Sequence, residues 1–204
     1  MSPRPIYLAS RSPRRRELLR QIGVTFELLP LRERPGRPVD VDEAPQAAET
    51  AQAYVLRIAT EKARTAAAIV AARRAAPRPV LSADTTVVCD GEILGKPRDV
   101  ADAGRMLARL AGRDHQVMTA VAVALGEALE TRVSVSRVWF RALDAAEIRR
   151  YVTGGESVDK AGAYAVQGLA AAFITRIEGS YSGIMGLPLA ETAGLLRSHG
   201  IMLP

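Results

Sequence analysis

The order of hydrophobic and polar residues predicts a chain that alternates between buried strands and helices. Residues 6–9 form a short apolar run that is typical of a buried strand, and Ser12 is a good N-cap for a helix with Pro13 in its first position. Between Glu49 and Arg74 the apolar residues recur at helical spacing, which predicts a long helix. The first third of the chain is therefore expected to contain at least one strand and two helices.

Residues 80–91 predict two short strands separated by polar residues. Val80 and Leu81 read as the first buried strand, and residues 86–89 read as the second. Between them, residues 82–85 are expected to form a polar break, which places Asp84 outside regular structure. Asp90-Gly91 is a typical hairpin turn.

The remaining segments complete a mixed α/β pattern. Strict alternation on both sides of a turn predicts a long antiparallel hairpin. The expected segments are a β segment at 23–29, a loop at 30–45, a helix at 102–111, the hairpin at 115–143, a helix at 144–153, an irregular stretch at 158–168, a strand at 171–179 and a closing helix at 187–200. The fold class is therefore α/β, with a long twisted sheet flanked by helices in a single domain that spans residues 1–204.

Composition adds a cellular setting to this picture. The 204 residues are 48% apolar, which is enough for a real core, and the single cysteine excludes an internal disulfide. No apolar run approaches the roughly 20 residues that span a bilayer, and the N-terminus lacks the apolar core of a signal peptide. We therefore expect a cytoplasmic protein with no membrane partner.

The positive charge is concentrated at the start of the chain. The net charge is +6, and residues 1–20 hold six arginines against one glutamate. Arg14, Arg15 and Arg16 fall in the first turn of the first helix, where the helix dipole disfavours cations unless an anion lies nearby. An anion site and a solvated arginine cluster both explain this turn, whereas nucleic acid is not expected, because aromatics are only 4%.

Lysine is rare, although basic residues are common. Only Lys62, Lys96 and Lys160 occur among 28 basic residues, which indicates positions where a compact ammonium is required. Together with carboxylates such as Glu43 and Asp84, they could bind a polyphosphate and a hard divalent cation. The alternatives are that Asp84 only caps a turn and that Lys62 is a solvated helix residue. No P-loop and no Gly-x-Ser-x-Gly elbow occurs in the sequence.

Six motifs together resemble one known family. The segments SRSPRRREL, EKA, SADTTV, GEILGKPRD, DKAGAYAVQG and GSYSGIMGLPL are similar, in the same order, to those of the Maf proteins, which are cytoplasmic nucleoside triphosphate pyrophosphatases. The resemblance implies an elongated mixed sheet flanked by helices, with two lobes around a central cleft, as in the inosine triphosphate pyrophosphatases. It also implies hydrolysis between the α and β phosphates, which gives a nucleoside monophosphate and pyrophosphate.

The resemblance also assigns roles to individual residues. Asp84, Lys62 and Lys96 would be catalytic, and Glu43 with Asp84 would hold a divalent metal cation, either Mg2+, Mn2+ or Co2+. The substrate would be bound by Ser10, Ser12, Arg14, Arg15, Thr85, Asp159, Lys160 and Gln167. In this chain LRERPGRPV is inserted before the acidic pair, so that Glu33 competes with Glu43 for the metal role, and Gly183 replaces an expected polar residue.

Three positions indicate which nucleotide base is accepted. The branch that acts on 7-methyl-GTP has Trp, Gln and Glu where this chain has Arg14, Thr85 and Gln167, and the latter set resembles the branch that hydrolyses dTTP and UTP. Gln167 also offers both a donor and an acceptor, as a pyrimidine imide edge requires. The alternative function is a nucleotide-binding regulatory protein that acts on cell division through a protein partner. The resemblance allows a homodimer.

Overall fold

The structure, a computed structural model, describes residues 5–32 and 40–203, so that Glu33 lies outside the described residues. Its strands are β1 (Ile6–Leu8), β2 (Phe26–Leu28), β3 (Val80–Cys89), β4 (Glu92–Leu94), β5 (Asp114–Leu125), β6 (Ala128–Phe140) and β7 (Ile174–Glu178). Its α-helices are α1 (Pro13–Gln21), α2 (Ala51–Ala72), α3 (Val100–Leu110), α4 (Ala145–Thr153), α5 (Tyr181–Met185) and α6 (Leu189–Ser198). Two short 3-10 helices, η1 (Ala161–Ala163) and η2 (Leu169–Phe173), lie between α4 and β7.

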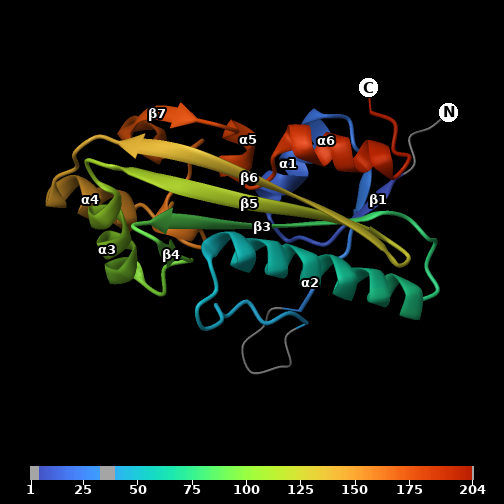
Figure 1. Cartoon of the computed structure of the whole chain (residues 1–204). Helices are drawn as coiled ribbons and strands as arrows, with labels where there is room; N and C mark the ends of the chain where they lie inside the picture. The colour runs from blue at the N-terminus through green and yellow to red at the C-terminus, as the bar shows by residue number, and fades with distance from the viewer. Residues whose placement is uncertain (1–4, 33–39, 204) are drawn as a thin grey trace. The chain divides into compact units, whose positions relative to one another are not determined.

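The seven strands form one mixed sheet. The strand order is β2-β1-β3-β5-β6-β7, and β4 pairs with β3 off this path. β1 pairs in parallel with both β2 and β3, whereas β3 with β4 and β6 with β7 are antiparallel. The predicted α/β class, with a mixed sheet flanked by helices, is confirmed (Figure 1).

The chain divides into two compact units. Unit 1 comprises residues 1–84, 119–133 and 186–204, and unit 2 comprises residues 85–118 and 134–185. The boundaries therefore fall inside β3, β5 and β6, so that these three strands contribute residues to both units. Each unit is described separately below.

Unit 1 is organised around β1 and the long helix α2. Ser12 caps α1 as predicted, because its side chain accepts a hydrogen bond from the backbone of Arg15. The buried residues of α2 recur every three or four positions and share one side of the helix, which contacts the sheet where Ser82 of β3 donates to the carbonyl of Ala59. Part of this contact is a cluster of buried apolar residues, namely Tyr7, Ala9, Leu29, Leu31, Ala66, Val70 and Val80.

Unit 2 has its own hydrophobic core. Buried residues of β3, α3, α4 and the segment that carries η1 and η2 belong to a single cluster. An aromatic group lies within this cluster, where Phe140 contacts Tyr164 and Phe173 edge to face. α4 begins at Asp144 with a complete capping box that includes Glu147, which agrees with the predicted start of this helix.

The prediction of a polar break at residues 82–85 was wrong, because β3 is continuous from Val80 to Cys89. Two side chains at alternate positions of this strand find polar partners on α2. Ser82 donates to the carbonyl of Ala59 at 2.6 Å, and Asp84 accepts from Lys62 at 2.9 Å. Polar residues can therefore occupy a buried strand here, since their hydrogen bonds are satisfied without interrupting the ladder.

Two boundaries near the C-terminus also differ from the prediction. Residues 171–173 belong to η2, so that β7 begins only at Ile174. The Gly-rich segment before α6 contains the short helix α5, whose start is stabilised because the Ser180 hydroxyl accepts from the backbone of Gly183 at 3.0 Å. Among the described residues, no helix is both long and apolar enough to cross a membrane.

Candidate active site

The centre of the candidate site is a lysine held between two carboxylates in unit 1. The Nζ atom of Lys62 lies 2.7 Å from Oε1 of Glu43 and 2.9 Å from Oδ1 of Asp84. Lys62 and Asp84 are buried, with exposed fractions of 7% and 8%. Because both carboxylates contact the same nitrogen atom, the structure places Glu43 and Asp84 close together, as a shared metal role would require.

Secondary structure explains how Lys62 and Asp84 meet. Lys62 lies in the buried stripe of α2, four residues after Ile58 and one before Ala63, and thus faces the sheet. Asp84 lies two residues after Ser82 on β3, and alternate strand residues share a face. Asp84 is therefore not a turn cap, and Lys62 is not a solvated helix residue, so both alternative interpretations are wrong.

Burial and charge act in opposite directions on this ion pair. Burial lowers the pKa of Lys62, but the charges of Asp84 and Glu43 outweigh it and raise this pKa above its usual value. Burial also raises the pKa of Asp84, although Lys62 and Arg15 oppose the shift. The site therefore keeps a charged ammonium beside a carboxylate whose proton affinity is increased, which suits a residue that accepts a proton.

The N-terminus of α1 supplies positive charge to the same site. Arg15 donates from Nη1 to the hydroxyl of Ser10 at 3.3 Å and from Nε to the carbonyl of Gly186 at 2.7 Å. The Ser10 hydroxyl also accepts from the backbone of Ser12 at 3.2 Å. Arg15 affects the pKa values of both Lys62 and Asp84 through its charge. The structure thus brings together Ser10, Ser12, Arg15, Glu43, Lys62 and Asp84.

Arg14 lies next to this group, in the first turn of α1. Its side chain is half-buried, and this burial lowers the pKa of its guanidinium. The helix N-terminus and the two arginines can bind phosphate groups, and the paired carboxylates lie beside them. The anion site at this helix stays a prediction, and the solvated arginine cluster remains its alternative.

The other candidates lie in unit 2. Lys96 is exposed in the turn after β4, and Lys160 donates from Nζ to the carbonyl of Val158 at 3.2 Å. The backbone of Gly162 donates to the carbonyl of Gly95 at 3.1 Å, which brings the turn of Lys96 beside the segment that contains Asp159 and Lys160. Three of the predicted residues are therefore neighbours through their backbone segments.

Gly162 makes this approach possible. Its φ of +66° is in the left-handed region, and a Cβ atom at this position would lie 2.8 Å from a side-chain carbon of Val87. Thr85 follows Asp84 on β3 and points to the opposite face of the strand. Gln167 is exposed in the turn that precedes η2.

Glu156 holds the segment that follows Gln167, and the sequence did not reveal this role. Its carboxylate accepts from the hydroxyl of Tyr151 at 2.8 Å and from the backbone of Leu169 and Ala170 at 2.8 and 3.2 Å. Burial opposes the resulting shift, yet these hydrogen bonds lower the pKa of Glu156. The carboxylate also lies where a Cβ atom of residue 168 would be, which explains Gly168.

Sequence reasoning also missed the residues that hold Glu43. Tyr54 and Arg57, both on α2, donate to backbone carbonyls around Glu43. The signal in the sequence is the position of Arg57, a charged residue five positions before Lys62 in the predicted helix.

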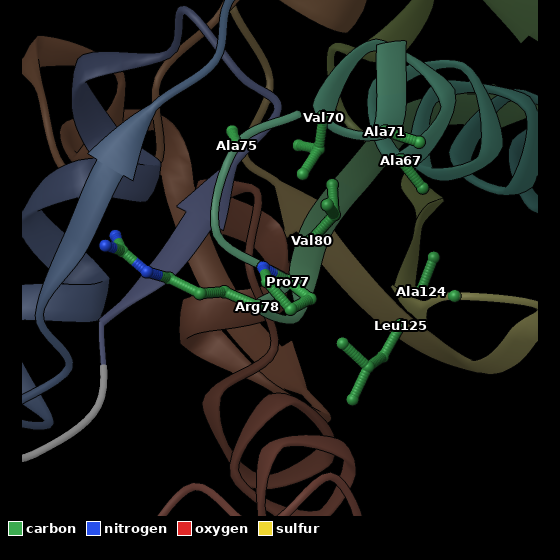
Figure 2. A pocket seen from close by; sticks show the side chains of 10 residues that line it. Ala67, Val70, Ala71, Ala75, Pro77, Arg78, Val80, Ala124 and Leu125 are labelled. Atoms are coloured by element: carbon green, nitrogen blue, oxygen red, sulfur yellow. The ribbon is translucent and has the colours of Figure 1, made fainter. Parts of the chain in front are cut away.

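A separate cavity in unit 1 does not have this character. It has a volume of about 120 Å³ and is lined by Ala67, Val70, Ala71, Ala75, Pro77, Arg78, Val80, Ala124, Leu125 and Gly126. Figure 2 shows apolar side chains from α2, from the start of β3 and from the end of β5, with the Arg78 side chain extending away from them. An apolar lining does not suit a triphosphate.

Comparison with known proteins identifies the family of this chain. The chain belongs to the Maf-like protein family, whose pattern it matches over residues 5–199. This match spans both units and contains every candidate residue described above.

Curated relatives are similar to this chain over nearly their whole length. The dTTP/UTP pyrophosphatase of Aromatoleum aromaticum is 56% identical over 200 residues, covering 97% of each chain. The dTTP/UTP pyrophosphatase of Bordetella parapertussis is 52% identical, covering 99% of this chain and 96% of the relative, and that of Nitrosomonas europaea is 51% identical, covering 96% and 95%. Among solved structures, the Staphylococcus aureus Ham1 protein matches with a TM-score of 0.48 and 15% identity over 96% of this chain and 97% of that one, which is too weak to support an inference.

Proposed function

We propose that this chain is a nucleoside triphosphate pyrophosphatase that hydrolyses dTTP and UTP to the monophosphate and pyrophosphate. The observation that carries this proposal is the contact of Glu43 and Asp84 with one buried ammonium, next to the arginine-bearing N-terminus of α1. The names of relatives that are 51–56% identical support the reaction and the two substrates.

Water attack on the α phosphorus breaks its bond to the oxygen that bridges to the β phosphorus. Asp84 accepts the proton that the water loses, and its raised pKa favours this transfer. Pyrophosphate leaves with the electron pair of the broken bond, and the charges of Lys62, Arg14 and Arg15 stabilise the negative charge that develops. No covalent intermediate with the chain is required.

The paired carboxylates also fit a divalent cation. Glu43 and Asp84 each have a second carboxylate oxygen besides the one that contacts Nζ of Lys62, and oxygen is the ligand that Mg2+ and Mn2+ prefer in proteins. In the described part of the chain, no group of three or more His, Cys, Asp or Glu residues is placed to hold a metal ion. A divalent cation bound to Glu43 and Asp84 would supply positive charge to the phosphate oxygens.

The unit 2 residues have proposed roles in catalysis and in substrate binding. Lys96, Asp159 and Lys160 lie on neighbouring backbone segments. Lys96 would be catalytic, and Asp159 and Lys160 would contribute charge and hydrogen bonds to the nucleotide. Gln167 would read the pyrimidine imide edge, with Thr85 as a second determinant. The proposed enzyme acts in the cytoplasm on free nucleotides and not on nucleic acid. Its proposed oligomeric state is a homodimer.

A substrate panel tests the proposed function. Pyrophosphate release is measured with dTTP, UTP, GTP, ATP and 7-methyl-GTP, each with Mg2+, Mn2+ or Co2+. We expect higher catalytic efficiency for dTTP and UTP than for the other nucleotides, because a wrong base would not match the donor and acceptor that Gln167 offers. Comparable efficiency on 7-methyl-GTP would remove the base assignment, and tight nucleotide binding without hydrolysis would favour the regulatory alternative.

A further inference from the structure

We propose that Arg57 is a positioning residue that fixes Glu43 against Lys62, an inference that rests on the proposed metal role of Glu43. Glu43 lies in a described segment, residues 42–46, that has no regular secondary structure. Nothing in the backbone ladder of a helix or strand therefore sets the place of its carboxylate. Contacts from side chains must do so.

Three consecutive carbonyls of this segment accept hydrogen bonds from α2. Arg57 donates from Nη1 to the carbonyl of Asp42 at 3.4 Å and from Nη2 to that of Ala44 at 3.0 Å. Tyr54 donates from its hydroxyl to the carbonyl of Glu43 at 3.0 Å. Arg57 thus holds the backbone on both sides of Glu43.

The carboxylate of Glu49, three residues after this segment, completes the clamp. Arg57 donates from Nε and Nη2 to the two oxygens of Glu49 at 2.7 and 2.9 Å, and Glu61 lies 3.6 Å from Nη1. The hydrogen bond with Arg57 is the largest influence on Glu49 and lowers the pKa of its carboxyl. These carboxylates balance the charge of Arg57, so the guanidinium does not need Glu43 as its partner.

The clamp and Lys62 share one rigid element. Tyr54, Arg57 and Lys62 all lie on α2, so the segment that carries Glu43 is held to the helix that carries the lysine. A fork of several N–H donors is required to reach two carbonyls and a carboxylate at once, and lysine has no such fork. Arg57→Lys should therefore keep the charge and lose the position of Glu43.

The test compares Arg57→Lys with Arg64→Lys, a matched control on the exposed side of α2. Mn2+ binding is titrated without nucleotide, and kcat and KM are measured with dTTP. We expect Arg57→Lys to weaken Mn2+ binding and lower kcat by about tenfold, the usual size for a residue that orients a ligand. The KM should change little, and Arg64→Lys should behave as the wild type.

A double-mutant cycle separates positioning from general stability. Because Arg57 acts through Glu43, Arg57→Lys should cause no further loss in a Glu43→Gln background. Tyr54→Phe, which removes one hydrogen bond and no charge, should give a smaller loss that also disappears in Glu43→Gln. This variant keeps the test decisive if Arg57→Lys fails to fold.

Two results would overturn the proposal. The first is equal Mn2+ affinity and kcat in Arg57→Lys and Arg64→Lys. The second is a loss of kcat from Arg57→Lys that is equally large in the wild-type and the Glu43→Gln backgrounds. If the wild type releases no pyrophosphate from dTTP or UTP, the proposed function fails, whereas loss of Mn2+ binding in Arg57→Lys would still support the clamp.

Discussion

At the scale of single residues, the site is defined by the charges of Lys62, Glu43 and Asp84. Lys62 is the shared partner of Glu43 and Asp84, and its ammonium is enclosed between α2 and β3. Removal of one member changes the electrostatics of the other two, because a buried charge without a partner is costly. Single substitutions here should affect activity more than folding, provided that one ion pair is kept.

Asp84→Asn should abolish pyrophosphate release and leave the protein folded. The change removes the proton acceptor, for which a loss of about a hundredfold or more in kcat is expected. Lys62 keeps Glu43 as a partner, and burial disfavours the ionised form of Asp84, as its raised pKa indicates. The melting temperature should stay within the few degrees that correspond to about 1 kcal/mol. Near-normal turnover in a folded variant would remove Asp84 from the mechanism.

Lys62→Arg should lower catalytic efficiency by about tenfold or more, although the charge is kept. A planar guanidinium is larger than the ammonium and cannot lie at 2.7 and 2.9 Å from the two carboxylates in the same enclosed position. Lys96→Arg tests the second lysine in the same assay. Circular dichroism and melting curves control for folding, and wild-type efficiency in both variants would show that the rarity of lysine was a coincidence of composition.

At the scale of elements, much of the architecture was predictable. Local capping chemistry predicts the helix starts at Ser12, Pro13 and Asp144, and the spacing of apolar residues predicts α2. The continuity of β3 was not predictable, because the residues that satisfy Ser82 and Asp84 come from α2, more than 20 positions away. For the same reason the sequence did not show how Arg57 and Glu156 hold their segments.

Gly162→Ala should destabilise the contact between the Lys96 turn and η1. The new methyl group would meet Val87 at 2.8 Å, and the backbone would be strained at a φ of +66°. Together these effects should lower the free energy of unfolding by about 1–3 kcal/mol. Urea denaturation measures the change, with Gly95→Ala as the control because a Cβ atom there meets nothing within 4 Å. Equal stability of the two variants would contradict this account.

β5 is joined to the segment before η2 by a hydrogen bond that is sensitive to acid. His115 is buried, its Nε2 lies 2.8 Å from the hydroxyl of Tyr164, and burial lowers the pKa of His115 to about 4. Because the folded pKa lies below the unfolded value of about 6.5, the histidine contributes stability above pH 6.5 that is lost as the pH falls toward 4. The loss should reach about 3 kcal/mol.

Urea denaturation at several pH values between 7 and 4 measures this loss. Other groups titrate in the same range, so the informative quantity is the difference between the wild type and His115→Gln, which cannot titrate. The free energy of unfolding should fall more steeply in the wild type. Parallel pH dependence in the two proteins would show that His115 is not the group responsible.

At the scale of the whole molecule, the candidate residues are divided between two compact units. Unit 1 contains the acid–lysine–acid group and the arginines of α1, and unit 2 contains Lys96, Asp159, Lys160 and Gln167. The family match over residues 5–199 includes both sets. Under the proposed function, Gln167 of unit 2 reads the base, and Gln167→Glu should lower catalytic efficiency on dTTP and UTP with little effect on folding.

The proposed reaction requires that water attacks the α phosphorus of dTTP or UTP. Hydrolysis of dTTP in water enriched in oxygen-18, followed by mass spectrometry of the products, shows which phosphorus is attacked. We expect one heavy oxygen atom in dTMP, unlabelled pyrophosphate, and neither product with Asp84→Asn. Release of orthophosphate, or heavy oxygen in pyrophosphate with unlabelled dTMP, would contradict it.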